Sequence, residues 1–152
     1  MRCRAALAVC LALALEACTN EPPRMPSTCI DTDRAGYERA LQAAPRAVLL
    51  PGGAAISACT ERVRTDAELQ NLGTVVHAVA EDLADRARGG DVAAARSLGY
   101  LSAAVAVGAE RSNGIAAELS RRVETTGFGV REAGVAVARA LEAGLSAGRA
   151  RG

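Results

Sequence analysis

The clearest hydrophobic pattern in the chain lies between residues 66 and 88, where apolar side chains recur at steps of three and four residues. They form a single stripe on one helix face, made of Leu69, Leu72, Val76, Val79 and Leu83. Thr65 and Glu68 match the capping box that opens many helices, and Gly89-Gly90 follows as a terminator. The pattern predicts an amphipathic helix over residues 66–88.

Three segments further along the chain also carry helical periodicity. Asp91 is placed to cap a buried helix over residues 92–108, whose uncharged run is too short to cross a membrane. Ser112-Asn113-Gly114 predicts a turn, and a further helix starts at Ile115. The last helix is predicted over roughly residues 130–147.

The part before residue 65 has shorter elements. The pattern predicts a helix over residues 34–44 that ends at Pro45, and a second short helix over residues 55–64. Between them, residues 47–50 form a brief extended piece that stops at Pro51-Gly52-Gly53.

These elements predict an all-α fold. Helices with short connections pack as antiparallel neighbours, so the four helices between residues 66 and 147 should form a small up-and-down bundle. Small residues, such as Gly99 and the alanines around it, allow close approach of neighbouring helices. Because alanine buries little apolar area, the core should be poor in bulk.

The N-terminus has the composition of an export signal. Arg2 and Arg4 precede a continuous apolar run over residues 5–15, which is shorter than the roughly 20 residues of a membrane span. The sequence Leu15-Glu16-Ala17-Cys18 resembles the lipobox of bacterial lipoproteins, although Glu16 stands where that family usually has a small or apolar residue. The resemblance covers residues 1–18 only. It implies cleavage before Cys18 and a diacylglyceryl group on its thiol. The alternative is an ordinary secretory cut after Ala14, which would release a soluble protein.

This boundary sets the expected domain organisation. Residues 1–17 are the signal peptide, and residues 18–28 contain three prolines and form an extended tether. Residues 29–148 are expected to form a single helical domain, followed by a disordered tail over residues 149–152, which has no apolar anchor.

Cys29 and Cys59 are the two cysteines that remain once Cys3 and Cys10 leave with the signal and Cys18 is lipidated. An even pair in an exported protein predicts a disulfide, which would clip the N-terminal segment to itself. A metal site built from both thiolates and His77 lacks a fourth ligand and close cysteine spacing, and free thiols are the remaining alternative.

Composition and charge exclude several function classes. Without the signal peptide, acidic and basic side chains are equal in number, so the chain has no electrostatic footprint for nucleic acid. The only aromatic residues are Tyr37, Tyr100 and Phe128, too few for a base-stacking platform. There is no lysine, which excludes a Schiff base or a P-loop lysine. Arginine as the sole basic residue type, with abundant alanine and glycine, is typical of a high-GC bacterium.

Individual candidates for chemistry are few. His77 is the only histidine, and its place between Gly73 and Glu81 at four-residue steps fits a half-exposed side chain on a helix flank better than a base or metal ligand. The segment from Asp31 to Gly36 imitates the start of a calcium loop but lacks the later ligands. We therefore assign no catalytic residue, metal or cofactor.

The sequence leads to an expectation about location and role, and it does not reach a molecular activity. We expect an exported protein, lipid-anchored on the outer face of a membrane and without enzymatic activity. It would act as a structural or interaction module that binds a protein partner or its own copy. The alternative is a binding module that holds a small apolar ligand between its helices.

Overall fold

The computed structural model describes residues 23–152, so the predicted signal peptide and Cys18 lie outside the described residues. The described part is built from helices, and its one extended pairing is an isolated bridge between Leu49 and Ala55. The predicted all-α fold is therefore confirmed. The elements are α2 (Thr28–Asp31), α3 (Arg34–Leu41), α4 (Ile56–Glu61), α5 (Asp66–Arg88), α6 (Val92–Glu110), α7 (Ala117–Thr126), the 3-10 turn η1 (Arg131–Ala133) and α8 (Val135–Arg151).

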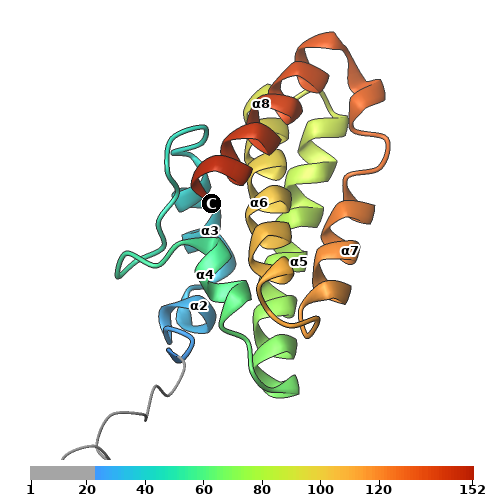
Figure 1. The fold of residues 1–152 in the computed structure, drawn as a ribbon. Coiled ribbons are helices and arrows are strands. Elements are labelled where there is room, and N and C mark those ends of the chain that lie inside the picture. The colour runs from blue at the N-terminus through green and yellow to red at the C-terminus, as the bar shows by residue number, and fades with distance from the viewer. Residues whose placement is uncertain (1–22) are drawn as a thin grey trace, which may run out of the picture.

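Helix α6 is the central element of the bundle. Figure 1 shows α5, α6 and α7 side by side, with α8 lying diagonally against α6 and the N-terminal helices on the opposite side from α7. By length and composition α6 could cross a membrane, but 67% of its most apolar window is buried inside the protein. This confirms the prediction of a buried helix, although the whole of α6, unlike its uncharged run, is long enough to span a membrane.

Local hydrogen bonds explain where the two long helices begin. Thr65 Oγ1 accepts from the Glu68 N–H at 3.2 Å, and a Glu68 carboxylate oxygen accepts from the Thr65 N–H at 3.1 Å. Asp91 Oδ1 accepts from the N–H groups of Ala93 and Ala94 at 2.9 and 3.0 Å. Both caps satisfy backbone donors that an isolated helix start leaves free, and both confirm the sequence prediction.

Helices α6 and α8 approach each other closely through glycine. A side-chain carbon at Gly144 would lie 2.9 Å from the Tyr100 nitrogen, and one at Gly99 would lie 2.9 Å from the Leu145 nitrogen. Because the opposing atoms are backbone, no side-chain rotation could relieve such contacts. The small residues predicted to allow close approach therefore define the α6–α8 packing.

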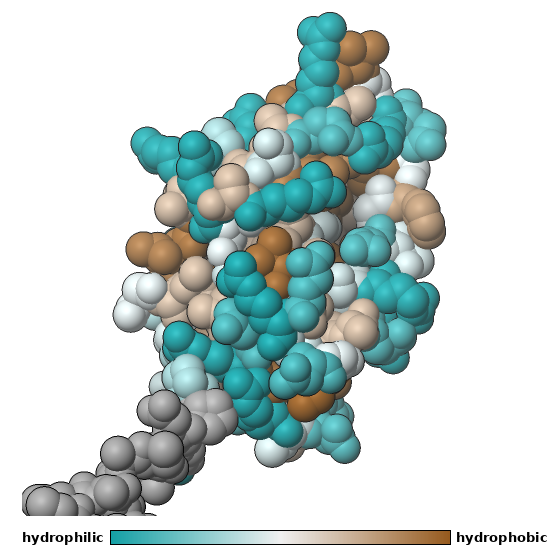
Figure 2. All heavy atoms as spheres, in the orientation of Figure 1, coloured by the Kyte–Doolittle hydropathy of each residue, from teal (hydrophilic) through white to brown (hydrophobic). Residues whose placement is uncertain are grey.

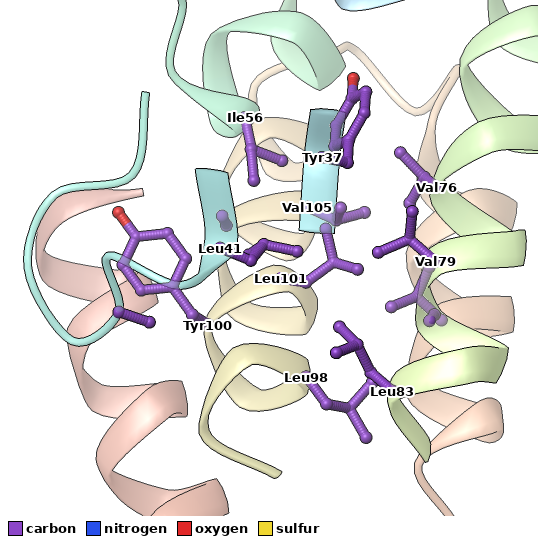
Figure 3. Close-up of a cluster of buried hydrophobic side chains, with 14 of the residues drawn as sticks. Tyr37, Leu41, Ile56, Val76, Val79, Leu83, Leu98, Tyr100, Leu101 and Val105 are labelled. Carbon is purple, nitrogen blue, oxygen red and sulfur yellow. The ribbon is translucent and has the colours of Figure 1, made fainter. Parts of the chain in front are cut away.

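The core fills the space between α6, α5 and the N-terminal helices. Figure 3 shows Leu83 of α5 facing Leu98 of α6, with Leu41 of α3 near Leu101 of α6. Tyr37 of α3 and Ile56 of α4 complete the N-terminal side of the core. Tyr37 and Tyr100 place their hydroxyl groups at the edges of this core. Tyr37 donates to the Cys29 carbonyl at 2.7 Å, and burial raises the pKa of its phenol.

The N-terminal segment is attached to the bundle by a disulfide and by polar contacts. Cys29 and Cys59 are bonded and fully buried, which confirms the predicted bridge. Tyr100 is the second clamp, because its hydroxyl accepts from the Val48 N–H at 3.0 Å and donates to the Arg151 carbonyl at 2.9 Å.

Helix ends differ from the predictions at several points. Helix α4 covers Ile56–Glu61 rather than residues 55–64, and α7 begins at Ala117 rather than at Ile115. The last helix begins at Val135 rather than near residue 130, because the 3-10 turn η1 comes before it. Helix α3 ends at Leu41 rather than at residue 44, since the following residues form a turn up to Pro45. The disordered tail predicted for residues 149–152 is wrong, because α8 continues to Arg151. Arg151 also donates to the Pro45 carbonyl at 3.0 Å. Polar and glycine contacts with α6 replace the apolar anchor that the sequence lacks.

Candidate interaction groove

A groove of about 570 Å³ lies on the surface between α5 and α7. Its apolar floor is formed by Leu69, Gly73, Ala78 and Leu119. A second hollow continues along the same two helices, and the two share the side chains of His77, Glu81 and Arg122. We call the whole feature the α5/α7 groove, with an N-terminal half near the start of α5 and a C-terminal half near its end.

The groove exists because α7 touches the bundle with few large side chains. Leu119 and Val123 are the only large apolar residues of α7 that are buried. Opposite them, α5 presents Gly73 and Ala78, which are too small to fill the space beside its main stripe. The two helices run in the same direction, since Leu119 of α7 lies beside the first half of α5 and Thr126 beside its last turn.

Ion pairs order the rim of the groove. Glu118 accepts hydrogen bonds from Arg121 at 2.7 Å and from Arg122 at 2.9 Å. These two guanidinium groups, Arg121 first, lower the pKa of Glu118 to about 2, and the same contact raises the pKa of Arg121. The Glu118 carboxylate therefore stays ionised over the whole physiological pH range.

His77 lies where the two halves of the groove meet. Its side chain is 37% exposed, and its Nδ1 is 3.3 Å from a Glu81 carboxylate oxygen one turn later. The half-exposed position predicted from the sequence is confirmed. No serine or cysteine occurs among the described residues that line the groove, and its threonine hydroxyls donate to carbonyl oxygens of their own helices.

The C-terminal end of the groove is closed by Arg88. Its guanidinium donates to the Thr126 carbonyl at 2.6 Å and to the Phe128 carbonyl at 3.1 Å, and it pairs with Asp85 at 2.7 Å. These bonds tie the end of α7 to the end of α5. Phe128 itself is 74% exposed.

The other residues singled out from the sequence take structural roles. The disulfide occupies both thiols of Cys29 and Cys59, and no cluster of metal-ligating side chains occurs in residues 23–152. Asp33 caps α3 by accepting from the Gly36 N–H at 2.7 Å. The lipid site predicted at Cys18 lies outside the described residues and stays a prediction.

Sequence reasoning did not find the groove, although part of its signal was visible. The row Gly73, His77, Glu81 at four-residue steps forms one wall, but nothing in the sequence shows that α7 lies opposite it. Comparisons with known protein families, with curated proteins and with solved structures found no match to this chain. The groove and the N-terminal signal are therefore the features from which a function can be inferred.

Proposed function

We propose that this chain is an exported, lipid-anchored envelope protein without enzymatic activity, which binds a protein partner through the α5/α7 groove. The observation that carries the proposal is the groove itself. It combines an apolar floor with a rim of ordered charges, which is the arrangement that binds an amphipathic helix.

The rest of the described surface offers fewer alternatives. Figure 2 shows hydrophilic side chains over most of the visible face, with hydrophobic ones in separate patches. The small-residue face of α6, which the sequence predicted to allow close approach of a neighbouring helix, is buried under α8. A partner in the groove would cover its apolar floor, where Leu69, Gly73 and Ala78 are partly exposed.

The side chains along the groove support the part of the proposal that concerns enzymatic activity. His77 has Glu81 as its neighbour, and no serine or cysteine lines the groove beside it within the described residues. The three threonine hydroxyls are engaged with their own helices.

Site-specific photo-cross-linking in cells of the source bacterium tests the proposal. A photoreactive residue replaces Ala78 in the groove, and Ala143 on the exposed face of α8 serves as the matched control. We expect an adduct of discrete mass from position 78 and none from position 143. Equal adducts from both positions, or none from position 78, would refute the groove as the contact surface.

The tether is tested separately. Replacing Cys18 with Ser should move the protein from the membrane fraction to the soluble fraction, because the acylated thiol is the proposed anchor. An unchanged distribution would remove the lipid anchor from the proposal and leave the groove unaffected.

A small apolar ligand is the second candidate for the groove. Its volume of about 570 Å³ lies in the range of small-molecule sites. Native mass spectrometry of the purified protein distinguishes the two, since a ligand of a few hundred daltons would add its mass to the chain and disappear in Ala78→Arg. If the measured mass is that of the chain without any ligand, a protein partner remains the proposed occupant of the groove.

A further inference from the structure

The charged side chains of the α5/α7 groove are unevenly distributed along its length. In the N-terminal half, three acids stand against one arginine: Asp66, Glu81 and Glu118 against Arg122. In the C-terminal half, three arginines stand against two acids: Arg88, Arg121 and Arg122 against Glu81 and Asp85. The first half therefore has an excess of two acids over arginines and the second an excess of one arginine over acids. Part of this charge is paired within the chain, since Glu118 contacts Arg121 and Arg122. The sign of the excess is opposite in the two halves, so the groove is electrostatically complementary to a second groove in the reverse direction.

An exposed aromatic side chain lies next to the basic half. Phe128 is the most exposed large hydrophobic residue in residues 23–152. Its backbone is held in place, because Arg88 donates to the carbonyls of Phe128 and Thr126. A side chain of this kind loses little freedom on burial and can anchor a contact. Its own chain leaves most of this side chain uncovered.

A two-fold axis through the middle of the groove would satisfy both features. Such an axis reverses the direction of α5, so an axis beside His77 and Glu81 places each acidic half against the basic half of the other copy. Residue 79 lies midway between His77 and Glu81. Arg88 and Gln70 are equally far from residue 79, about 14 Å along the helix at 1.5 Å per residue. Phe128, bonded to Arg88, would therefore reach the level of the apolar floor near Leu69 and Gly73 of the second copy.

We propose that the partner of the α5/α7 groove is a second copy of this chain, bound antiparallel in a symmetric dimer with Phe128 of each copy inserted into the apolar floor of the other. The inference rests on the proposed function, because it assigns the occupant of the same groove. Two-fold dimers are the commonest soluble oligomers, and their interface must be self-complementary.

Sedimentation velocity of the purified protein over a concentration series tests the dimer. We expect a monomer–dimer equilibrium with no larger species. Phe128→Ser should lower the association constant by roughly tenfold or more, because each dimer loses two buried rings. Phe128→Leu keeps an apolar side chain and should stay within about threefold of the wild type.

Charge complementarity is tested by two opposite substitutions at one exposed position in the acidic half. Thr74 lines the groove, and its hydroxyl donates only to the Gln70 carbonyl of its own helix. Thr74→Arg should weaken the dimer about three- to tenfold, and Thr74→Glu should strengthen it, since each change occurs twice at the interface. Ala143→Arg and Ala143→Glu, on the exposed face of α8, are matched controls and should change nothing.

The symmetry is tested by introduced cysteines. Two copies of residue 77 would lie beside the axis, so His77→Cys should form a disulfide between copies. Two copies of residue 70 would be about 27 Å apart along the helix, so Gln70→Cys should not. The opposite result would overturn the antiparallel arrangement even if a dimer forms.

Several results would refute the self-association directly. They are a monomer at every concentration up to about 1 mM, where even weak dimers are populated, equal effects of both Thr74 substitutions, and an unchanged association constant in Phe128→Ser. An adduct between position 78 and a different protein, in cells whose purified protein is monomeric, would leave the proposed function standing and remove only the second copy as partner.

Discussion

Gly144 of α8 is the position at which one added side-chain carbon should destabilise the fold most. A side-chain carbon there would lie 2.9 Å from the Tyr100 nitrogen and closer still to the Arg96 carbonyl, and real side-chain carbons essentially never come within 3.0 Å of such atoms. The opposing atoms belong to the backbone of α6. Gly144→Ala therefore requires α6 and α8 to separate by on the order of 1 Å, which weakens dispersion contacts along their whole length.

Two opposing effects set the magnitude for Gly144→Ala. Alanine in a helix interior is favoured over glycine by about 1 kcal/mol. Overpacking costs about 1 to 3 kcal/mol, and the rigid backbone on both sides places this site at the upper end. We expect a net loss of about 2 kcal/mol in the free energy of unfolding, measured by urea denaturation with far-ultraviolet circular dichroism.

Gly73 provides a matched control within the same protein. An added carbon at Gly73 would meet only Leu119 Cδ1, at 3.8 Å, which is an ordinary contact. Gly73→Ala should therefore raise the free energy of unfolding by about 0.5 to 1 kcal/mol through helix propensity alone. If Gly144→Ala stabilised the protein as Gly73→Ala does, the close α6–α8 packing would be wrong.

Three further predictions concern the clamps on the N-terminal segment and on α6. Tyr100→Phe leaves the buried Val48 N–H without its acceptor and should cost about 1 to 3 kcal/mol by urea unfolding, whereas an unchanged midpoint would argue against this clamp. Replacing Cys29 and Cys59 together by Ala opens a link between residues 30 apart in sequence and should cost about 3 to 4 kcal/mol in the same assay. The pKa of Asp91 is lowered by the Ala94 N–H and then by Arg86. The contribution of the Asp91 carboxylate to the free energy of unfolding is present above the ordinary carboxyl pKa of about 4 and is lost as pH falls below that value. Stability should therefore fall more steeply below pH 4 in the wild type than in Asp91→Asn, and parallel curves would contradict this.

Local sequence signals were sufficient to predict most of the helices. The caps at Thr65 and Asp91 and the stripe over residues 66–88 predicted two helix starts that the structure confirms. Capping and periodicity act over a few residues, so a single sequence carries them fully. The Cys29–Cys59 bridge was predictable for a different reason, because export and an even cysteine count left one pair. The export signal and Cys18 remain predictions from the sequence alone.

The tertiary structure decided the features that depend on distant segments. The end of α8 is ordered through Tyr100 and Pro45, which the sequence places far from Arg151. The groove depends on α7 resting against α5 through little more than Leu119 and Val123, opposite the small residues Gly73 and Ala78. The acidic and basic side chains of α5 and α7 gather in separate halves of the groove only because the two helices run in the same direction. Periodicity shows which face of a helix is buried, whereas the choice of neighbour comes from packing across the whole chain.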